Sequence, residues 1–172
     1  GRKKIMNLPY PINPTLKDLP VYQPGRPIEE VARELNLPAA SIIKLASNEN
    51  PLGPSPAALK AMQDVLANIH LYPDGNAFYL KERLAKKLGV VPAELILGNG
   101  SNEILQLVAR AFLNPGDEVV VAQYAFAIFT TVAVSAGGRV VTVPARDWGA
   151  DLPAMRAAVT DRTRVIFLAN PN

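Results

Sequence analysis

From residue 94 onward, apolar segments of strand length alternate regularly with segments of helical periodicity. The breaks between them carry turn residues, such as Asn114-Pro115-Gly116-Asp117 and Gly137-Gly138. Apolar strands that alternate with helices are typical of a largely parallel sheet with helices on both faces. The expected elements are strand 94–98, helix 102–112, strand 117–122, helix 124–136, strand 139–143, a helix over about 152–159 and strand 164–169.

The residues before this α/β region follow a different pattern. Six prolines between Pro9 and Pro27 interrupt any long element, so residues 7–27 are expected to form an extended arm. A short helix is predicted over residues 28–35. The arm carries many apolar side chains and cannot bury them within itself, so we expect it to pack on another surface.

Two further helices are predicted before the α/β region. Apolar residues at three- and four-residue spacing indicate a helix from Pro56 to about Ile69, and a second over residues 77–88 that ends at Gly89. We therefore expect three parts: an arm with a short helix (1–44), a helical segment (45–92) and the first part of an α/β domain (93–172).

Composition excludes several classes of protein. The chain has 49% hydrophobic and 19% charged residues, and its net charge of +3 gives no basic patch for nucleic acid. No apolar run reaches the roughly 18 residues of a membrane span. The absence of cysteine excludes disulfides and thiolate metal sites, and no other metal site is expected. These features favour a cytoplasmic protein that binds neither nucleic acid nor membrane.

The run Gly98-Asn99-Gly100-Ser101-Asn102 joins the first expected strand to the helix after it. Its glycines allow positive φ and close backbone approach, and Ser101 or Asn102 is suited to cap the helix. The free N–H groups of a helix N-terminus favour an anion, so a phosphate would bind here. An ordinary strand-to-helix turn is the alternative. The run is neither a GxGxxG motif nor a Walker A loop, which weakens a nucleotide interpretation.

Other polar and aromatic residues follow the later strands. Ligands of open α/β sheets bind at the carboxyl ends of the strands, where Gln123-Tyr124-Ala125-Phe126 and Asn170-Pro171-Asn172 are expected to lie. A phosphate anchor, an aromatic ring and an amide donor are what a flat anionic heterocycle requires. Phe126 as a core aromatic, and the asparagines as turn formers around Pro171, remain open.

Together these segments resemble the first part of the histidinol-phosphate aminotransferases, within the fold type I family of pyridoxal-phosphate enzymes. They occur in the family's order over nearly the whole chain from Tyr22. The segments are 21–25 (VYQPG), 45–56 (LASNENPLGPSP), 72–75 (YPDG), 98–103 (GNGSNE), 123–126 (QYAF) and 170–172 (NPN). The resemblance implies an α/β fold in which an N-terminal arm and helices precede part of a mostly parallel sheet, as in an incomplete fold type I large domain.

The resemblance implies pyridoxal 5′-phosphate as the cofactor. Gly100 and the backbone N–H groups of Ser101 and Asn102 would bind its phosphate, and Phe126 would stack on its pyridine ring, where many relatives have tyrosine.

Three further residues acquire roles from the resemblance. Tyr72 would reach across a homodimer interface to the cofactor phosphate of the partner subunit, and Tyr22 and Asn50 would contribute to the substrate pocket. A turn aromatic at Tyr72 and a packing anchor at Tyr22 are the structural alternatives.

The implied activity is transfer of an amino group between histidinol phosphate and 2-oxoglutarate, in histidine biosynthesis. The alternatives are a threonine-phosphate decarboxylase-like enzyme and a non-catalytic α/β module that binds a phosphorylated metabolite. Family members continue beyond Asn172 to a Schiff-base lysine, and none of the lysines of this chain is assigned that role, although Lys44 follows Ser41 at a Ser-x-x-Lys spacing. We therefore expect the chain to be truncated, to lack catalytic residues and to be inactive alone.

Overall fold

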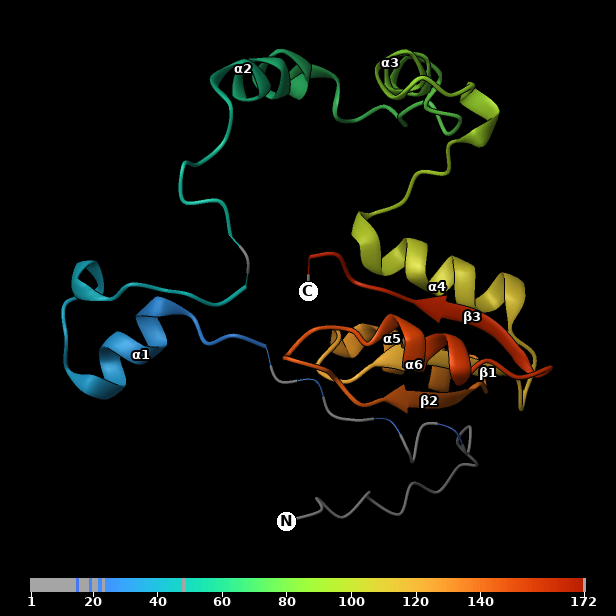
Figure 1. The fold of residues 1–172 in the computed structure, drawn as a ribbon. Coiled ribbons are helices and arrows are strands. Elements are labelled where there is room, and N and C mark those ends of the chain that lie inside the picture. The colour runs from blue at the N-terminus through green and yellow to red at the C-terminus, as the bar shows by residue number, and fades with distance from the viewer. Residues whose placement is uncertain (1–14, 16–18, 20–21, 23, 48, 172) are drawn as a thin grey trace, which may run out of the picture. The chain divides into compact units, whose positions relative to one another are not determined.

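The computed structural model describes Thr15, Leu19, Tyr22, residues 24–47 and residues 49–171 of the chain (Figure 1). Two compact units, one formed by residues 23–95 and one that contains the residues from Ile96 onward, are described separately. The predicted arm lies largely outside the described residues, as does Asn172. The division into three parts stays a prediction. No helix in the described residues is long and apolar enough to cross a membrane.

The unit of residues 23–95, called here the unit before residue 96, consists of helices joined by extended segments. Its helices are α1 (Ile28–Leu35), α2 (Pro56–Val65) and α3 (Phe78–Leu88), with 3₁₀ helices η2 (Ala39–Ser41), η3 (Leu66–Asn68) and η4 (Pro92–Glu94). Gly89 ends α3 in a left-handed conformation at φ +71°, as predicted. Among the described residues of this unit, only Ala32 and Ala85 are buried, so it has almost no core of its own.

The unit after residue 95 is an α/β domain. Its elements are α4 (Gly100–Phe112), β1 (Glu118–Ala122), α5 (Ala127–Ser135), β2 (Arg139–Val143), α6 (Leu152–Ala157) and β3 (Thr163–Phe167). All strand pairs are parallel, in the order β2-β1-β3, so the first strand in sequence is central. Val120 of β1, for example, is in register with Val141 and Ile166. The predicted parallel α/β arrangement is confirmed.

The core of the domain lies on both faces of β1, which is buried throughout. Successive residues of a strand point to opposite faces. Val119 and Val121 accordingly pack with Phe129 in the cluster formed with α4 and α5, whereas Val120 packs with Met155 of α6. Helices therefore cover both faces of the sheet, as predicted (Figure 1).

Several predicted boundaries are wrong. Residues 94–98 do not form a strand: they leave η4 as an extended segment with no partner strand in the described part of the chain, and a strand requires ladder hydrogen bonds. The next helix starts at Gly100, so Asn99 occupies the N-cap position instead of Ser101 or Asn102. Helix α5 starts only at Ala127, after a turn.

A buried carboxylate, that of Glu118, lies at the amino-terminal end of the sheet. Oε1 of Glu118 accepts a hydrogen bond from Arg139 (2.5 Å) and pairs with Arg162 (2.7 Å), while its Oε2 accepts from the Thr160 hydroxyl (2.7 Å). Hydrogen bonds from Arg139 and Thr160, aided by the charges of both arginines, lower the pKa of this carboxyl to about 2. The cluster ties β1, β2 and the segment before β3 together.

Candidate functional site

The carboxyl edge of the sheet is where the predicted cofactor residues of the α/β unit lie. Because α4 leads through residues 113–117 into the start of β1, its own N-terminus is at the opposite end, near the carboxyl ends of the strands. Figure 1 shows α4 beginning on the side toward which the β2 and β3 arrows point. Ser101, Asn102 and Phe126 thus share one edge of the domain.

The first turn of α4 presents free backbone donors. The N–H groups of Ser101 and Asn102 donate to no group in the described residues, and both residues are exposed. Oε2 of Glu103 accepts a hydrogen bond from the Asn99 N–H at 2.5 Å. The Glu103 carboxylate therefore leaves the N–H groups of Ser101 and Asn102 free. Free N–H groups at the positive end of a 13-residue helix suit an oxyanion such as phosphate.

Gly98 and Gly100 serve this turn in different ways. Gly100 has φ +76°, which glycine adopts freely, and a Cβ there would meet nothing within 4 Å. Gly98 does not have the expected positive φ. A Cβ on Gly98 would instead lie 2.9 Å from Cδ1 of Ile104 and 3.0 Å from Oε2 of Glu103. The open space at Gly100, next to two free donors, fits the phosphate of pyridoxal phosphate.

Phe126 occupies the N-cap position of α5 and is 41% exposed, so it is not part of the buried core. Its ring meets Phe129 edge to face, with 6.1 Å between centroids, and Phe129 stacks on Phe167 at 5.0 Å. The core therefore supports Phe126 from one side. Part of its ring stays open to a flat ligand.

The other predicted site residues have simpler surroundings. Both ends of the Asn50 amide are used in its own turn, since Oδ1 accepts from the Leu52 N–H (3.1 Å) and Nδ2 donates to the Gly53 carbonyl (3.0 Å). Tyr72 is fully exposed, and Tyr22 is 50% exposed. Asn50 thus shapes a loop, whereas the tyrosine rings are available for further contacts.

Sequence reasoning missed the partners of the segment after β1. Trp148 stacks on Tyr124, with 5.4 Å between ring centroids and 29° between planes. Oε1 of Gln123 accepts a hydrogen bond from the Ala145 N–H at 3.0 Å. The available signal was the only tryptophan of the chain, placed shortly after a strand and next to Gly149.

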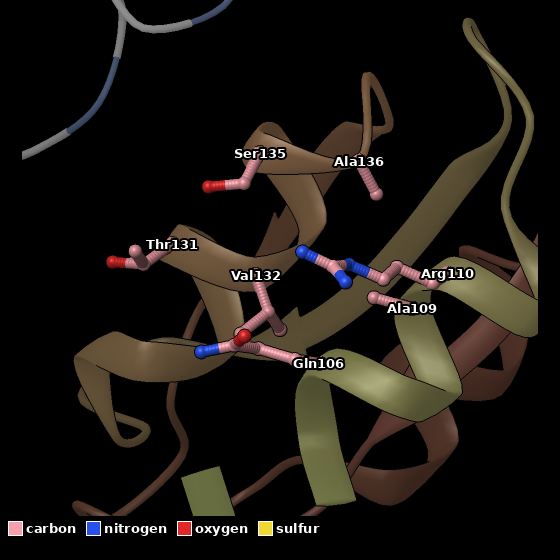
Figure 2. A pocket seen from close by; sticks show the side chains of 7 residues that line it. All are labelled: Gln106, Ala109, Arg110, Thr131, Val132, Ser135 and Ala136. Atoms are coloured by element: carbon pink, nitrogen blue, oxygen red, sulfur yellow. The ribbon is translucent and has the colours of Figure 1, made fainter. Parts of the chain in front are cut away.

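A separate cavity of about 230 Å³ lies between α4 and α5 (Figure 2). Arg110 extends from α4 toward α5, and the hydroxyl groups of Thr131 and Ser135 point to the same side of α5. No predicted site residue contributes to its lining, which is formed by Gln106, Ala109, Arg110, Thr131, Val132, Ser135 and Ala136.

Comparison with known proteins finds close relatives in sequence. The chain is 56% identical over 159 residues to histidinol-phosphate aminotransferase 2 of Hydrogenovibrio crunogenus, covering 92% of this chain and 42% of that protein. It is 58% identical over 151 residues to the histidinol-phosphate aminotransferase of Methylobacillus flagellatus, covering 88% of this chain and 41% of that protein. The chain thus spans about two-fifths of the length of these relatives.

Solved structures share the fold. The histidinol-phosphate aminotransferase of Sinorhizobium meliloti, in complex with pyridoxal-5′-phosphate, matches 96% of this chain and 44% of its own with a TM-score of 0.78 and 30% identity. Aspartate aminotransferase of Thermotoga maritima matches 94% of this chain and 46% of its own with a TM-score of 0.76 at 20% identity, a likeness of fold alone. The family model for aminotransferase class I and II matches residues 40–172. The chain belongs to this family of class I and II aminotransferases.

Proposed function

We propose that the protein to which this chain belongs is a pyridoxal-phosphate-dependent aminotransferase that transfers an amino group between histidinol phosphate and 2-oxoglutarate. The observation that carries this proposal is the carboxyl edge of the sheet, where the free N–H groups of Ser101 and Asn102 share an edge with the half-open ring of Phe126. More than 50% identity to proteins named histidinol-phosphate aminotransferase supports the choice of substrate.

Each residue at this edge would contribute binding or orientation. The N–H groups of Ser101 and Asn102 hold the phosphate, and Gly100 leaves the space that the phosphate needs. Phe126 lies against the pyridine ring and excludes water from one face. When bound, pyridoxal phosphate supplies the electron sink of the reaction, while the protein fixes its orientation. Catalytic residues are not assigned within residues 1–172.

Tyr22, Tyr72 and Asn50 have roles outside this edge in the proposal. The protein acts as a homodimer in which the exposed Tyr72 reaches the cofactor phosphate of the other subunit. Tyr22 contributes to the substrate pocket. Asn50 acts there through the turn that it closes with Gly53, rather than through a free amide. A cytoplasmic location completes the proposal.

The proposed phosphate site is tested by removing one backbone donor in the full-length protein. Ser101→Pro deletes an N–H in the first helical turn, where proline is tolerated, and Ser101→Ala is the matched control that keeps it. A hydrogen bond to a charged group contributes about 1.5–3 kcal/mol, so Ser101→Pro should weaken pyridoxal phosphate binding about tenfold or more in a spectroscopic titration. Equal affinities of the two folded variants would contradict the assignment.

The reaction is tested with purified full-length protein and pyridoxal phosphate. Formation of glutamate from histidinol phosphate and 2-oxoglutarate is expected, with much weaker turnover of histidinol that lacks the phosphate. Release of carbon dioxide from threonine phosphate, without glutamate formation, would favour the decarboxylase instead. Binding of phosphorylated compounds without either reaction would favour the non-catalytic module.

A further inference from the structure

We propose that the turn Arg146–Gly149 is a positioning element that holds the segment after β1 through the ring of Trp148, and so fixes the orientation of Phe126. The proposal rests on the proposed function, because it takes Phe126 as the ring that meets the cofactor. Trp148 itself is a positioning residue, since it acts through Tyr124 and not on the reacting atoms.

The first observation is the unusual backbone of this turn. Arg146 and Gly149 form an antiparallel bridge with hydrogen bonds of 3.0 and 2.9 Å in the two directions. The two residues between them, Asp147 and Trp148, have φ values of +50° and +65°. Turns with positive φ at both central positions favour Asn-Gly, and this conformation is costly for a large side chain. A tryptophan here indicates a function or a compensating contact.

The second observation is what the strained turn contacts. The ring of Trp148 stacks on Tyr124, which itself has φ +64°. Both residues of this ring contact are therefore non-glycine residues with a left-handed backbone, and Asp147 beside Trp148 has one as well. Because 81% of Trp148 is exposed, the stack buries little surface, and the arrangement does not serve the hydrophobic core.

The third observation is that the same two segments are joined twice more. The Gln123 N–H donates to the Val143 carbonyl at 2.7 Å, and the Gln123 side chain accepts from the Ala145 N–H at 3.0 Å. The stack of Trp148 on Tyr124 is the last of the three contacts before the chain reaches Phe126. The segment after β1 is thus fastened along its length to the segment after β2.

These contacts act on the position of Phe126. Its backbone carbonyl accepts from the Phe129 N–H at 3.0 Å, and its ring meets Phe129, so its later side is fixed by α5. On its earlier side, the Ala125 N–H donates to the Ala122 carbonyl at 3.2 Å, and Tyr124 in this turn has the left-handed conformation that redirects the chain. Releasing Tyr124 should therefore let Phe126 move without unfolding α5.

The experiment separates the ring of Trp148 from the turn that carries it. In the full-length protein, Trp148→Ala removes the ring, Trp148→Phe keeps an aromatic ring, and the double variant Asp147→Asn with Trp148→Gly removes the ring while giving the turn its preferred sequence. Tyr79→Ala is the matched control, because Tyr79 is equally exposed and pairs with Phe78 at the same centroid separation of 5.4 Å.

Two measurements are made on each variant. In the cofactor-free protein, amide hydrogen exchange over residues 123–126 should accelerate in both variants that lack the ring, while exchange within β1 stays unchanged. Pyridoxal phosphate affinity, measured by absorbance and circular dichroism of the bound cofactor, should fall about tenfold in the same two variants, as expected for a displaced contact group. Trp148→Phe should restore both properties, and Tyr79→Ala should change neither.

The double variant Asp147→Asn with Trp148→Gly decides between the two roles of Trp148. If it shows wild-type exchange at residues 123–126 and wild-type affinity, Trp148 serves only its own turn and the proposal is overturned. A Phe126→Leu variant keeps the two proposals distinguishable. If that variant binds the cofactor normally, the role of Phe126 in the proposed function is wrong, whereas the exchange results still report whether Trp148 holds the segment.

Discussion

At the scale of single residues, the turn before α4 depends on two glycines, where the absence of a Cβ atom permits the observed backbone. Gly100 provides a left-handed backbone, and Gly98 lets α4 approach the segment before it. Sequence alone predicted that both glycines matter, but it assigned the same reason to both. The distinction depends on where Ile104 and Glu103 lie, which no local pattern specifies.

Gly100→Ala should weaken cofactor binding in the full-length protein. The left-handed conformation costs an alanine about 1–2 kcal/mol, and the new methyl group enters the space proposed for the phosphate. Gly89→Ala is the matched control, since Gly89 has φ +71° and also nothing within 4 Å of a Cβ. Both variants should lose similar stability in urea, and only Gly100→Ala should bind pyridoxal phosphate more weakly. If the two variants bind pyridoxal phosphate with equal affinity, residues 98–102 form an ordinary turn and not a phosphate site.

Glu118 should make the stability of the α/β unit depend on acid. Its pKa is about 2 in the folded protein against an ordinary value of 4.5, so the stabilisation is complete above pH 4.5 and is lost as the pH falls toward 2. Glu118→Gln should lower the melting temperature at neutral pH and flatten its dependence on pH between these values. Glu82→Gln, at an exposed position of α3, should leave the melting profile unchanged.

At the scale of elements, the sequence predicted α1, α3, β1, β2 and β3 closely because their apolar spacing, turn residues and end signals agree. The predicted strand over residues 94–98 is wrong because an apolar run indicates burial but does not supply a partner strand. The turn at 124–126 was missed because helical periodicity in the following residues extended the predicted helix backward through Tyr124. The strained Asp147-Trp148 turn has no sequence signature, since its residues are not the ones that such turns favour.

The stack of Phe129 on Phe167 should link α5 to β3 energetically. Both rings are buried, and their centroids lie 5.0 Å apart with 18° between planes. A double-mutant cycle with Phe129→Leu and Phe167→Leu should give a coupling free energy of about 0.5–1.5 kcal/mol in urea unfolding. Additive effects would mean that each ring contributes through burial alone.

At the scale of the whole molecule, the two units differ sharply in how much they bury. The α/β unit has clusters on both faces of its sheet, whereas the unit before residue 96 leaves large apolar side chains exposed, including Ile43, Leu45 and Leu52. Each large apolar side chain contributes about 1.5–3 kcal/mol when fully buried. We therefore expect the helical unit to bury these side chains on a further surface, such as that of the second subunit in the proposed homodimer.

The dimer proposal makes a prediction for the full-length protein. Sedimentation at micromolar concentration should show a dimer, and deletion of residues 1–22 should weaken it. Tyr72→Phe should reduce cofactor affinity about tenfold by removing one hydrogen bond to phosphate, without changing the sedimentation coefficient. Tyr79→Phe serves as the control at another exposed tyrosine. An active monomer with bound cofactor would show that Tyr72 does not act across subunits.

The order of the three described strands also sets the order in which a ribosome supplies them. The central strand β1 is synthesised before both of its neighbours, so it emerges with two open edges and an unpaired Glu118. Arg139 follows 21 residues later and Thr160 follows 42 residues later, which at about 5–20 residues per second means roughly 1–4 s and 2–8 s. We therefore expect these three strands to pair from β1 outward during translation, with the Glu118 carboxylate hydrated until Arg139 and Thr160 are available.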